Sequence, residues 1–208
     1  MFDDDTQLMI RFSTGEENAF DQLFQRNSRR AYDIAIRFLA NPDDAEDIVQ
    51  EAFLRIYSSK KSWKPKASFN TWLYRIVANL CLKKIRKAKI IRWESLDSKE
   101  GAQEFDNPSP LPDETAIQPD EQLLRKETSE LVQMAVQKLP PAQRMAVILH
   151  KFEALSYKEI SEAMECSVPA VESLLHRAKL NLRKELRPLF YNQPQVFDDS
   201  RVNKNVGE

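Results

Sequence analysis

Residues 41–56, NPDDAEDIVQEAFLRI, decide the fold class because they carry a full set of signals for an amphipathic helix. Asn41 is a favourable N-cap, Pro42 fits the first helical position, and the acids that follow suit the N-terminal end of the helix dipole. Apolar residues then recur at helical spacing and predict one buried stripe: Ala45, Ile48, Val49, Ala52, Phe53 and Ile56. The other side of this helix carries mostly polar residues.

The stretches on either side repeat the helical pattern. Residues 16–39 place apolar side chains at helical intervals and predict one or two core helices. Residues 58–68 contain a proline and four lysines, which predicts a loop, and the next stretch predicts a third helix whose buried face holds Phe69, Trp72, Leu73, Ile76, Val77 and Leu80. With only three glycines in 208 residues, few positions suit tight hairpins. We therefore predict an all-α protein.

A polar stretch divides these helical patterns into two groups. Between residues 94 and 121 there are nine acids against Lys99 alone, and four prolines lie in the same region. Such a segment cannot bury enough apolar surface to fold alone. We predict two small helical domains, residues 1–92 and 120–187, joined by a flexible acidic Pro-containing linker at 93–119 and followed by a disordered tail at 188–208.

The net charge of −1 and the pI near 6.2 would by themselves argue against nucleic-acid binding. The charge is segregated, however. From Ala52 to Trp93 the chain runs 42 residues without Asp or Glu and carries 12 Lys or Arg and all three tryptophans. Basic side chains interleaved with aromatic ones can neutralise phosphates and stack on unpaired bases. This block therefore indicates a nucleic acid that is opened at some stage.

A second nucleic-acid signal lies near the C-terminus. Residues 156–159 form a capping box, residues 165–167 fit a three-residue turn, and a second helix begins at Val168, which is the spacing of a helix-turn-helix. The outward face of the second helix can reach phosphates and base edges through Ser173, His176, Arg177 and Lys179. Glu172 is either a specificity residue that accepts from cytosine N4 or a solvated charge. The alternative for the whole motif is a short helical bundle that reads no DNA.

The cysteines and the hydropathy of the chain argue against a disulfide-rich, metal-binding or membrane-spanning protein. Cys81 and Cys166 are far apart, with no CxxC and only two histidines in the chain, so we expect reduced thiols, no metal site and no cofactor. The N-terminus is acidic, and no apolar run approaches the length of a membrane span. These features predict a cytoplasmic protein without membrane insertion.

At three stretches the chain resembles the extracytoplasmic-function (ECF) sigma factors of bacterial RNA polymerase, within the sigma-70 family. The matching sequences are DAEDIVQEAFL at 44–54, FNTWLYRIVAN at 69–79, and LSYKEI at 155–160 with HRAK at 176–179. They occur in the family's order and cover roughly residues 16–187. The resemblance implies a promoter-specificity subunit that catalyses nothing itself, in which a region 2 domain melts the −10 element and a region 4 domain reads the −35 duplex.

The resemblance also implies the site residues. The basic coiled coil of the polymerase's largest subunit would bind Asp44, Asp47, Gln50, Glu51 and Arg55. The −10 strand, with one base extruded into a pocket of the loop at 62–68, would contact Lys64, Lys66, Trp72, Arg75, Asn79, Lys83, Arg86 and Lys87. The −35 duplex would contact Glu172, Ser173, His176, Arg177 and Lys179. Trp72 lies on the apolar stripe, so a core role competes with base contact. An anti-sigma factor is a further implied partner.

Two other functions stay open on the sequence. One is a helix-turn-helix regulator that acts without binding core polymerase, although it leaves the acid-free block unexplained. The other is a metal-dependent nuclease that uses Asp43, Asp44, Asp47 and Glu51. The family often has Asp or Asn at position 83 and a basic residue at position 172, so Lys83 and Glu172 here leave the promoter sequence open. The linker acids could enter the polymerase's nucleic-acid channel, shield the basic domain or act only as a tether.

Overall fold

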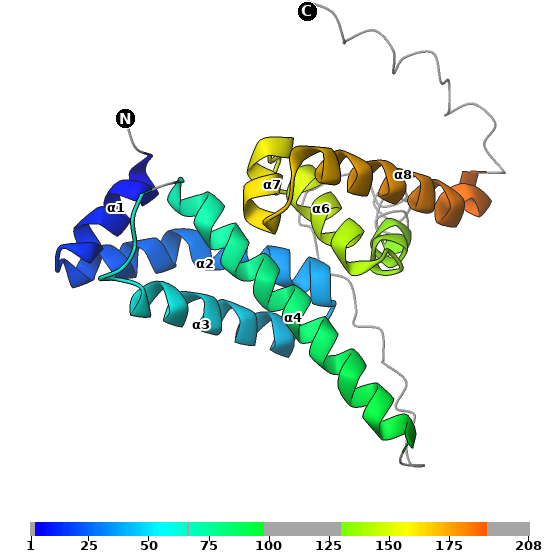
Figure 1. Ribbon diagram of the computed structural model, residues 1–208, viewed down its shortest axis with the longest axis horizontal. Coiled ribbons are helices and arrows are strands. Elements are labelled where there is room, and N and C mark those ends of the chain that lie inside the picture. Colours follow the sequence, from blue (N-terminus) through cyan, green and yellow to red (C-terminus); the bar gives the residue numbers. More distant parts are fainter. Residues whose placement is uncertain (1–2, 66, 98–129, 191–208) are drawn as a thin grey trace, which may run out of the picture.

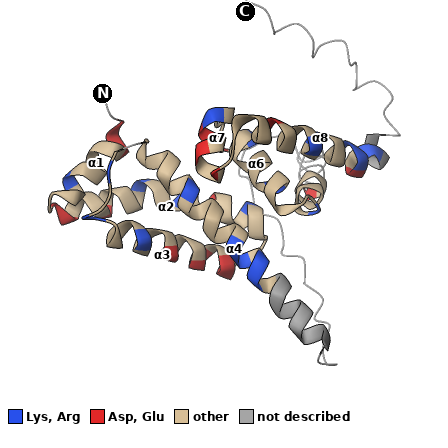
Figure 2. Cartoon of the chain, in the orientation of Figure 1, with Lys and Arg blue, Asp and Glu red and all other residues tan. Residues whose placement is uncertain are grey.

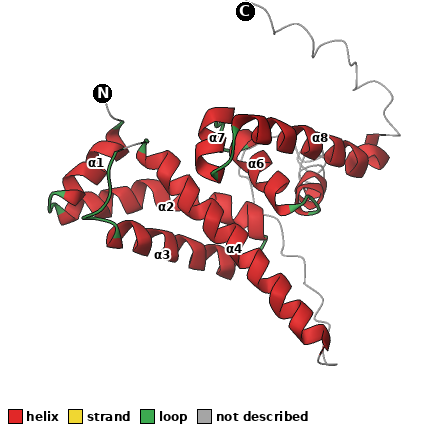
Figure 3. Ribbon diagram, in the orientation of Figure 1, coloured by secondary structure: helices red, strands yellow, loops and turns green. Residues whose placement is uncertain are grey.

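The computed structural model describes residues 3–65, 67–97 and 130–190, and every regular element in these ranges is a helix (Figure 3). Residues 130–137 are helical, and the other elements are α1 (Asp4–Ser13), α2 (Glu17–Leu39), α3 (Pro42–Ser58), α4 (Phe69–Asp97), α6 (Pro141–Lys151), α7 (Tyr157–Met164) and α8 (Val168–Phe190). The predicted all-α class is confirmed. Figure 1 shows α4 crossing α2 and α3, with α6, α7 and α8 gathered on the other side of α4.

Helix α3 forms as its sequence predicts. The side-chain oxygen of Asn41 accepts a hydrogen bond from the backbone N–H of Asp44 at 3.0 Å, and Pro42 occupies the first turn. All six residues of the predicted stripe are buried. They pack against α2, which forms one continuous helix where one or two were expected, and against α4. Burial of this apolar stripe is what attaches an otherwise polar helix to the domain.

Helix α1 was not predicted, although its signals are present. Asp3 caps the helix by accepting the backbone N–H of Thr6, and Leu8, Met9 and Phe12 are buried. The Thr6 hydroxyl oxygen accepts the backbone N–H of Phe69 at 2.9 Å, which supplies a partner for one free amide at the start of α4. The N-terminal helix therefore fixes where α4 begins and, with it, the end of the preceding loop.

The C-terminal domain contains the predicted helix-turn-helix. The capping box at the start of α7 is complete, because Ser156 accepts the backbone N–H of Glu159 while the Glu159 carboxylate accepts the backbone N–H of Ser156. Helix α7 ends at Met164, residues 165–167 form the turn, and α8 begins at Val168. The buried side chains of Ile160, Ala163 and Val171 hold the two helices together.

The two domains pack against each other and share apolar core residues. Polar contacts close the same interface at the C-terminal end of α2, whose last carbonyl groups lack partners within the helix. Arg144 donates to the carbonyl of Phe38 at 2.8 Å, and Gln137 donates to the carbonyl of Arg37 at 2.6 Å. The Arg37 guanidinium also lies 4.2 Å from the ring centre of Phe152. Side chains far apart in the sequence thus make this contact, and the patterns along the chain do not specify it.

Two helices continue a few residues past the predicted domain boundaries. Helix α4 continues to Asp97, so residues 93–97 are helical and do not belong to a flexible linker, because no proline or glycine ends the helix there. Helix α8 continues through Pro188 to Phe190, since a proline so close to the end disturbs only the last turn. The predicted linker beyond residue 97, the start of the predicted second domain up to residue 129, and the tail beyond residue 190 lie outside the described residues.

Candidate nucleic-acid interface

The five residues expected to bind polymerase all lie on α3. Asp44, Asp47, Glu51 and Arg55 follow one another at spacings of three and four, so they share one side of the helix. Figure 2 shows acids along α3, in contrast to the basic residues farther along α4. The Asp47 side chain is 71% exposed, and Arg55 donates to Glu51 at 2.7 Å. An acidic, accessible helix face of this kind suits a basic partner.

A basic residue of α4 already engages two of these acids. The Lys84 ammonium lies 2.5 Å from one oxygen of Asp44 and 3.1 Å from one of Asp47. Burial opposes the charge on Lys84, but the hydrogen bonds to both carboxylates outweigh it and raise the pKa of the ammonium group. The sequence analysis missed Lys84 because it is 37 positions from Asp47 in the chain. A basic partner that docks on α3 would compete with this pair.

Exposed apolar side chains accompany the acidic face. Leu54 is 63% exposed, Tyr57 48% and Phe24 43%, and the rings of Phe24 and Phe53 lie 4.9 Å apart edge to face. Leu54 and Tyr57 are three positions apart and off the buried stripe, which is the signal that could have predicted them. Their exposure adds apolar area next to the charged residues, as a protein-docking surface requires.

Most of the residues expected to hold the −10 strand line up along α4. Arg75, Asn79, Lys83 and then Arg86 and Lys87 succeed one another at three- to four-residue intervals, so they share one side of the helix. From Arg75 to Lys87 this row rises by about 18 Å along the helix axis. Arg75 is partly exposed, and the other four residues are exposed. The row provides four positive charges and one amide at a spacing suited to a backbone that follows the helix.

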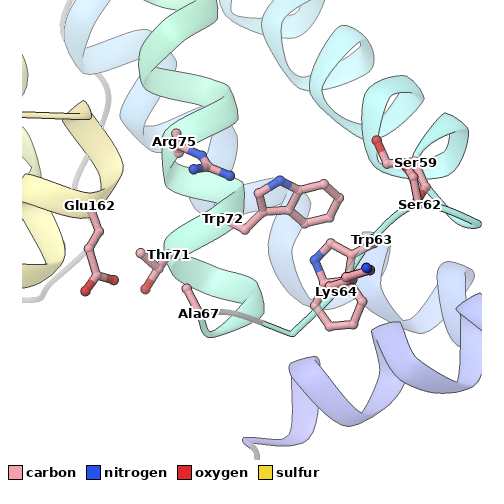
Figure 4. Close-up of a pocket in the computed structure, with 9 residues that line it drawn as sticks. All are labelled: Ser59, Ser62, Trp63, Lys64, Ala67, Thr71, Trp72, Arg75 and Glu162. Carbon is pink, nitrogen blue, oxygen red and sulfur yellow. The ribbon is translucent and has the colours of Figure 1, made fainter.

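A pocket of about 540 Å³ lies at the N-terminal end of this row (Figure 4). Its walls come from the loop after α3 and from the first turns of α4: Ser59, Ser62, Trp63, Lys64, Ala67, Thr71, Trp72 and Arg75. The rings of Trp63 and Trp72 are centred 6.0 Å apart, and those of Trp72 and Phe69 6.1 Å apart. Trp72 thus contacts the core and also lines the pocket, which joins the two roles that the sequence left in competition. Lys66 lies outside the described residues.

Two carboxylates of the helix-turn-helix lie against the same side of α4. Glu165 lies 3.6 Å from Arg75, and its other oxygen accepts a hydrogen bond from the Asn79 amide at 3.4 Å. Glu162 lines the pocket, which it approaches from α7 while Trp63 approaches from the loop (Figure 4). The sequence analysis missed both carboxylates as neighbours of α4, because only the packing of the two domains brings them there.

The residues expected to read duplex DNA lie on α8. The residues are all exposed: Glu172, Ser173, His176, Arg177 and Lys179. Arg177 donates to the carbonyl of Ser173 in its own helix at 3.2 Å. The preceding turn and the buried face of α8 orient these side chains outward, because Val171 and Ala178 are fully buried. The second helix of the motif therefore presents an open polar face that fits a major groove.

Similarity to known proteins covers both domains. Residues 23–90 match the sigma-70 region 2 family and residues 129–182 match the sigma-70 region 4 family. The chain is 32% identical to the RNA polymerase sigma-H factor of Pseudomonas aeruginosa over 185 residues, which are 89% of this chain and 95% of that protein. It is 33% identical to the ECF RNA polymerase sigma factor SigW of Bacillus subtilis over 175 residues, 84% of this chain and 92% of that one.

This chain belongs to the ECF sigma factors of bacterial RNA polymerase. Its fold is similar to that of the sigma factor RpoE of Bartonella quintana, solved in complex with the anti-sigma factor NepR, with a TM-score of 0.61 and 22% identity over 81% of this chain and 96% of that one. An ECF sigma factor is a non-enzymatic initiation factor that binds core polymerase and promoter DNA and directs promoter-specific transcription. This membership decides against both the stand-alone regulator and the nuclease.

The described residues also bear on metal binding, membrane insertion and the state of the cysteines. Within residues 3–65, 67–97 and 130–190, no three His, Cys, Asp or Glu side chains gather as metal ligands would. None of the helices described combines the length and the apolar composition that crossing a membrane demands. Cys81 is buried, and this burial raises the pKa of its thiol to about 12. Cys166 is partly exposed in the turn of the helix-turn-helix, and burial raises its pKa as well.

Proposed function

We propose that the region 2 domain, residues 1–92, opens the −10 element and holds the freed strand along α4, while the region 4 domain, residues 120–187, reads the −35 duplex with α8. The acidic face of α3 docks on the basic coiled coil of the polymerase's largest subunit. The protein works in the cytoplasm, where its polymerase and promoters are.

The pocket beside the polar row of α4 carries this proposal. Arg75 belongs to both, so a base that enters the pocket leaves its backbone next to Asn79 and Lys83. The indole rings of Trp63 and Trp72 offer aromatic surface to the base, and Lys64 adds a positive charge at the wall. Lys66, two positions after Lys64 in the sequence, is a further proposed contact to the backbone of the strand. The site thus combines a stacking surface with a continuous track of donors, as single-strand binding requires.

The free-energy cost of extruding a base and the gain from stacking it in the pocket are of similar size. Extruding a base from the duplex costs a few kcal/mol. Stacking on an aromatic side chain returns roughly 1–3 kcal/mol per base, and the charged contacts along α4 add to it. Capture of one base in the pocket can therefore offset most of the cost of extruding that base. The remainder comes from the holoenzyme, so the free chain does not melt DNA by itself.

Recognition of the −35 duplex rests on α8. Arg177 and Lys179 supply charge for phosphates and base edges, and His176 and Ser173 supply donors and acceptors of shorter reach. Glu172 lies on the same exposed side and accepts from a cytosine N4 group if it faces the bases. The site needs no cofactor, because unpairing and reading are binding reactions.

The partners follow from the charged faces and from the similar structure. The acids Asp44, Asp47 and Glu51, with Gln50 and Arg55, form the polar part of the polymerase-docking face, and Leu54 and Tyr57 form its apolar part. The similar sigma factor RpoE was solved with an anti-sigma factor. We infer that this chain is likewise held inactive by an anti-sigma factor, which covers one or more of these faces.

Run-off transcription tests the proposal. Core polymerase is supplied with this chain on a genomic promoter library, and the start sites are compared with those of core polymerase alone. New, discrete start sites preceded by two shared sequence elements are expected. A chain that binds duplex DNA specifically but neither associates with core polymerase nor changes its start sites would contradict the proposal.

A further inference from the structure

We propose that the free sigma factor closes on itself, with Glu165 and Glu162 of the region 4 domain covering the strand-binding side of α4. The inference rests on the proposed role of that side of α4 in holding the −10 strand. It adds a built-in inhibitory contact that must open before the strand is captured, whether or not an anti-sigma factor is present.

The contacts place carboxylate oxygens where a nucleic acid would place its own acceptors. Glu165 pairs with Arg75 at 3.6 Å and accepts from Asn79 at 3.4 Å, so the first two members of the row are occupied together. Glu162 adds a second negative charge beside the pocket. These carboxylates hold the donors that a strand would use, and they repel its phosphates.

The backbone at Glu165 determines which substitution can test this contact. Glu165 occupies the C-cap of α7 in the left-handed conformation, with φ 52° and ψ 44°. This position normally holds glycine or asparagine, because a Cβ atom crowds the backbone there. Ala40 and Ala154 share this conformation, so it is a feature of the turn itself, and glycine is a compatible replacement for Glu165.

The two domains also contact each other through residues that do not belong to the polar row of α4, and these contacts can stabilise the closed state. Arg144 and Gln137 bond the last carbonyl groups of α2, and Arg30 lies 3.3 Å from Glu153, which also accepts from Tyr74 at 3.4 Å. Apolar residues of both domains complete the contact. The carboxylates of α7 and its turn are therefore held over α4 by groups outside the DNA-binding sets. A partner that separates the domains would uncover the row in one step.

Anisotropy of a fluorescein-labelled oligothymidylate measures the contact directly in the full-length chain. Glu165→Gly removes the carboxylate and suits the left-handed backbone, so it should not destabilise the turn. If the closed state holds most molecules, the apparent affinity for the single strand rises roughly fivefold or more, because the fraction of competent molecules rises. Thermal unfolding of the variant confirms that the fold is intact.

Two matched variants serve as controls. Ala40→Gly relaxes the same left-handed C-cap conformation at the end of α2 without removing a charge. Asp21→Asn removes an exposed carboxylate of α2 that is outside the contact. Both should bind the oligothymidylate as the wild type does. If Asp21→Asn strengthens binding as much as Glu165→Gly, the effect is one of net charge and the inhibitory contact is overturned.

Lys83→Glu separates failure of this inference from failure of the proposed function. If Lys83→Glu weakens binding while Glu165→Gly leaves it unchanged, α4 holds the strand and the inhibitory contact is overturned. If Lys83→Glu does not change the affinity for the oligothymidylate in the wild type or in Glu165→Gly, the proposed strand-binding side itself is wrong.

The reactivity of a thiol gives a second measurement of opening. The Cys166 thiol next to Glu165 should react faster with a disulfide reagent in Glu165→Gly than in Ala40→Gly. Equal rates in the two variants would contradict a more open state.

Discussion

Helices α4 and α8 carry the two faces that we propose bind DNA, and the two faces differ in access more than in chemistry. Both present basic and amide or hydroxyl side chains at helical spacing. On α8 the whole set is exposed, and Arg177 donates to a carbonyl of its own helix. On α4 two of the members are bonded to Glu165 of the other domain. Charge along a helix thus marks a DNA-binding face, but tertiary packing decides whether that face is available.

The largest effect is expected on α4. Lys83→Glu combined with Arg86→Glu reverses two charges of the row and should reduce promoter opening by roughly tenfold or more, because phosphate neutralisation is lost and replaced by repulsion. Permanganate reactivity of unpaired thymines in the holoenzyme complex measures opening. Association with core polymerase, measured in parallel, should remain close to that of the wild type. Equal loss of both activities would contradict the separation of the α3 and α4 roles.

A smaller but still large effect is expected on α8. Arg177→Glu should weaken binding of the isolated chain to promoter duplex by at least about 1 kcal/mol, which is roughly fivefold in Kd. Electrophoretic mobility shift with a duplex from the run-off experiment measures it. Glu165→Gly should leave duplex binding unchanged, because α8 is already accessible. An increase in duplex affinity for that variant would show that α8 is covered as well.

A substitution at Glu172 tests whether this residue of the α8 face contributes to base preference. If its carboxylate accepts from a cytosine, Glu172→Gln should relax the preference at one base pair while the average affinity changes little. If it is a solvated charge, the same change should strengthen binding to every sequence. Selection from a randomised −35 duplex pool distinguishes the two outcomes.

The acidic face of α3 is also partly covered by a residue of the same protein, because Lys84 of α4 pairs with Asp44 and Asp47. Lys84→Ala should leave Asp44 and Asp47 uncompensated and strengthen association with core polymerase severalfold, in keeping with a surface pair worth up to about 1 kcal/mol. Surface plasmon resonance on immobilised core polymerase measures it. Lys61→Ala, an exposed lysine of the loop, is the control for net charge. Weaker association of Lys84→Ala would mean that Lys84 positions the acids.

The smallest effect concerns pH and the contact between the domains. Burial raises the pKa of the Glu153 carboxyl above its ordinary value, although Arg30 opposes the shift. A raised carboxyl pKa stabilises the fold fully below the ordinary pKa and loses that contribution as the pH rises through the raised value. The midpoint of thermal unfolding should therefore fall over this window more for the wild type than for Glu153→Gln. If the midpoint of thermal unfolding changes with pH in the same way in both proteins, Glu153 is not the source of this pH dependence.

Much of the fold could be read from short-range patterns. Asn41 and Pro42 start α3, and the Ser156–Glu159 capping box starts α7, because a cap needs only side chains within one turn of the helix end. Helix α1 shows that such a signal can be overlooked: Asp3 and the buried Leu8, Met9 and Phe12 follow the same rules. Helix α4 extends beyond the predicted domain boundary, where no breaker stands, and α8 continues through Pro188. A helix end without a defined cap is less well predicted from sequence than a capped start.

The sequence by itself determined most of the helices, the family and the two polar helix faces that are proposed to bind DNA, because these depend on residue spacing and on the sign of charge along one helix. Only the tertiary structure decided that Lys84 pairs with the acids of α3, that Trp72 both packs and lines a pocket, and that Glu165 reaches Arg75 and Asn79. Those contacts join residues up to 90 positions apart, as Arg75 and Glu165 are. Their energies arise from burial and geometry between elements, which no local pattern records.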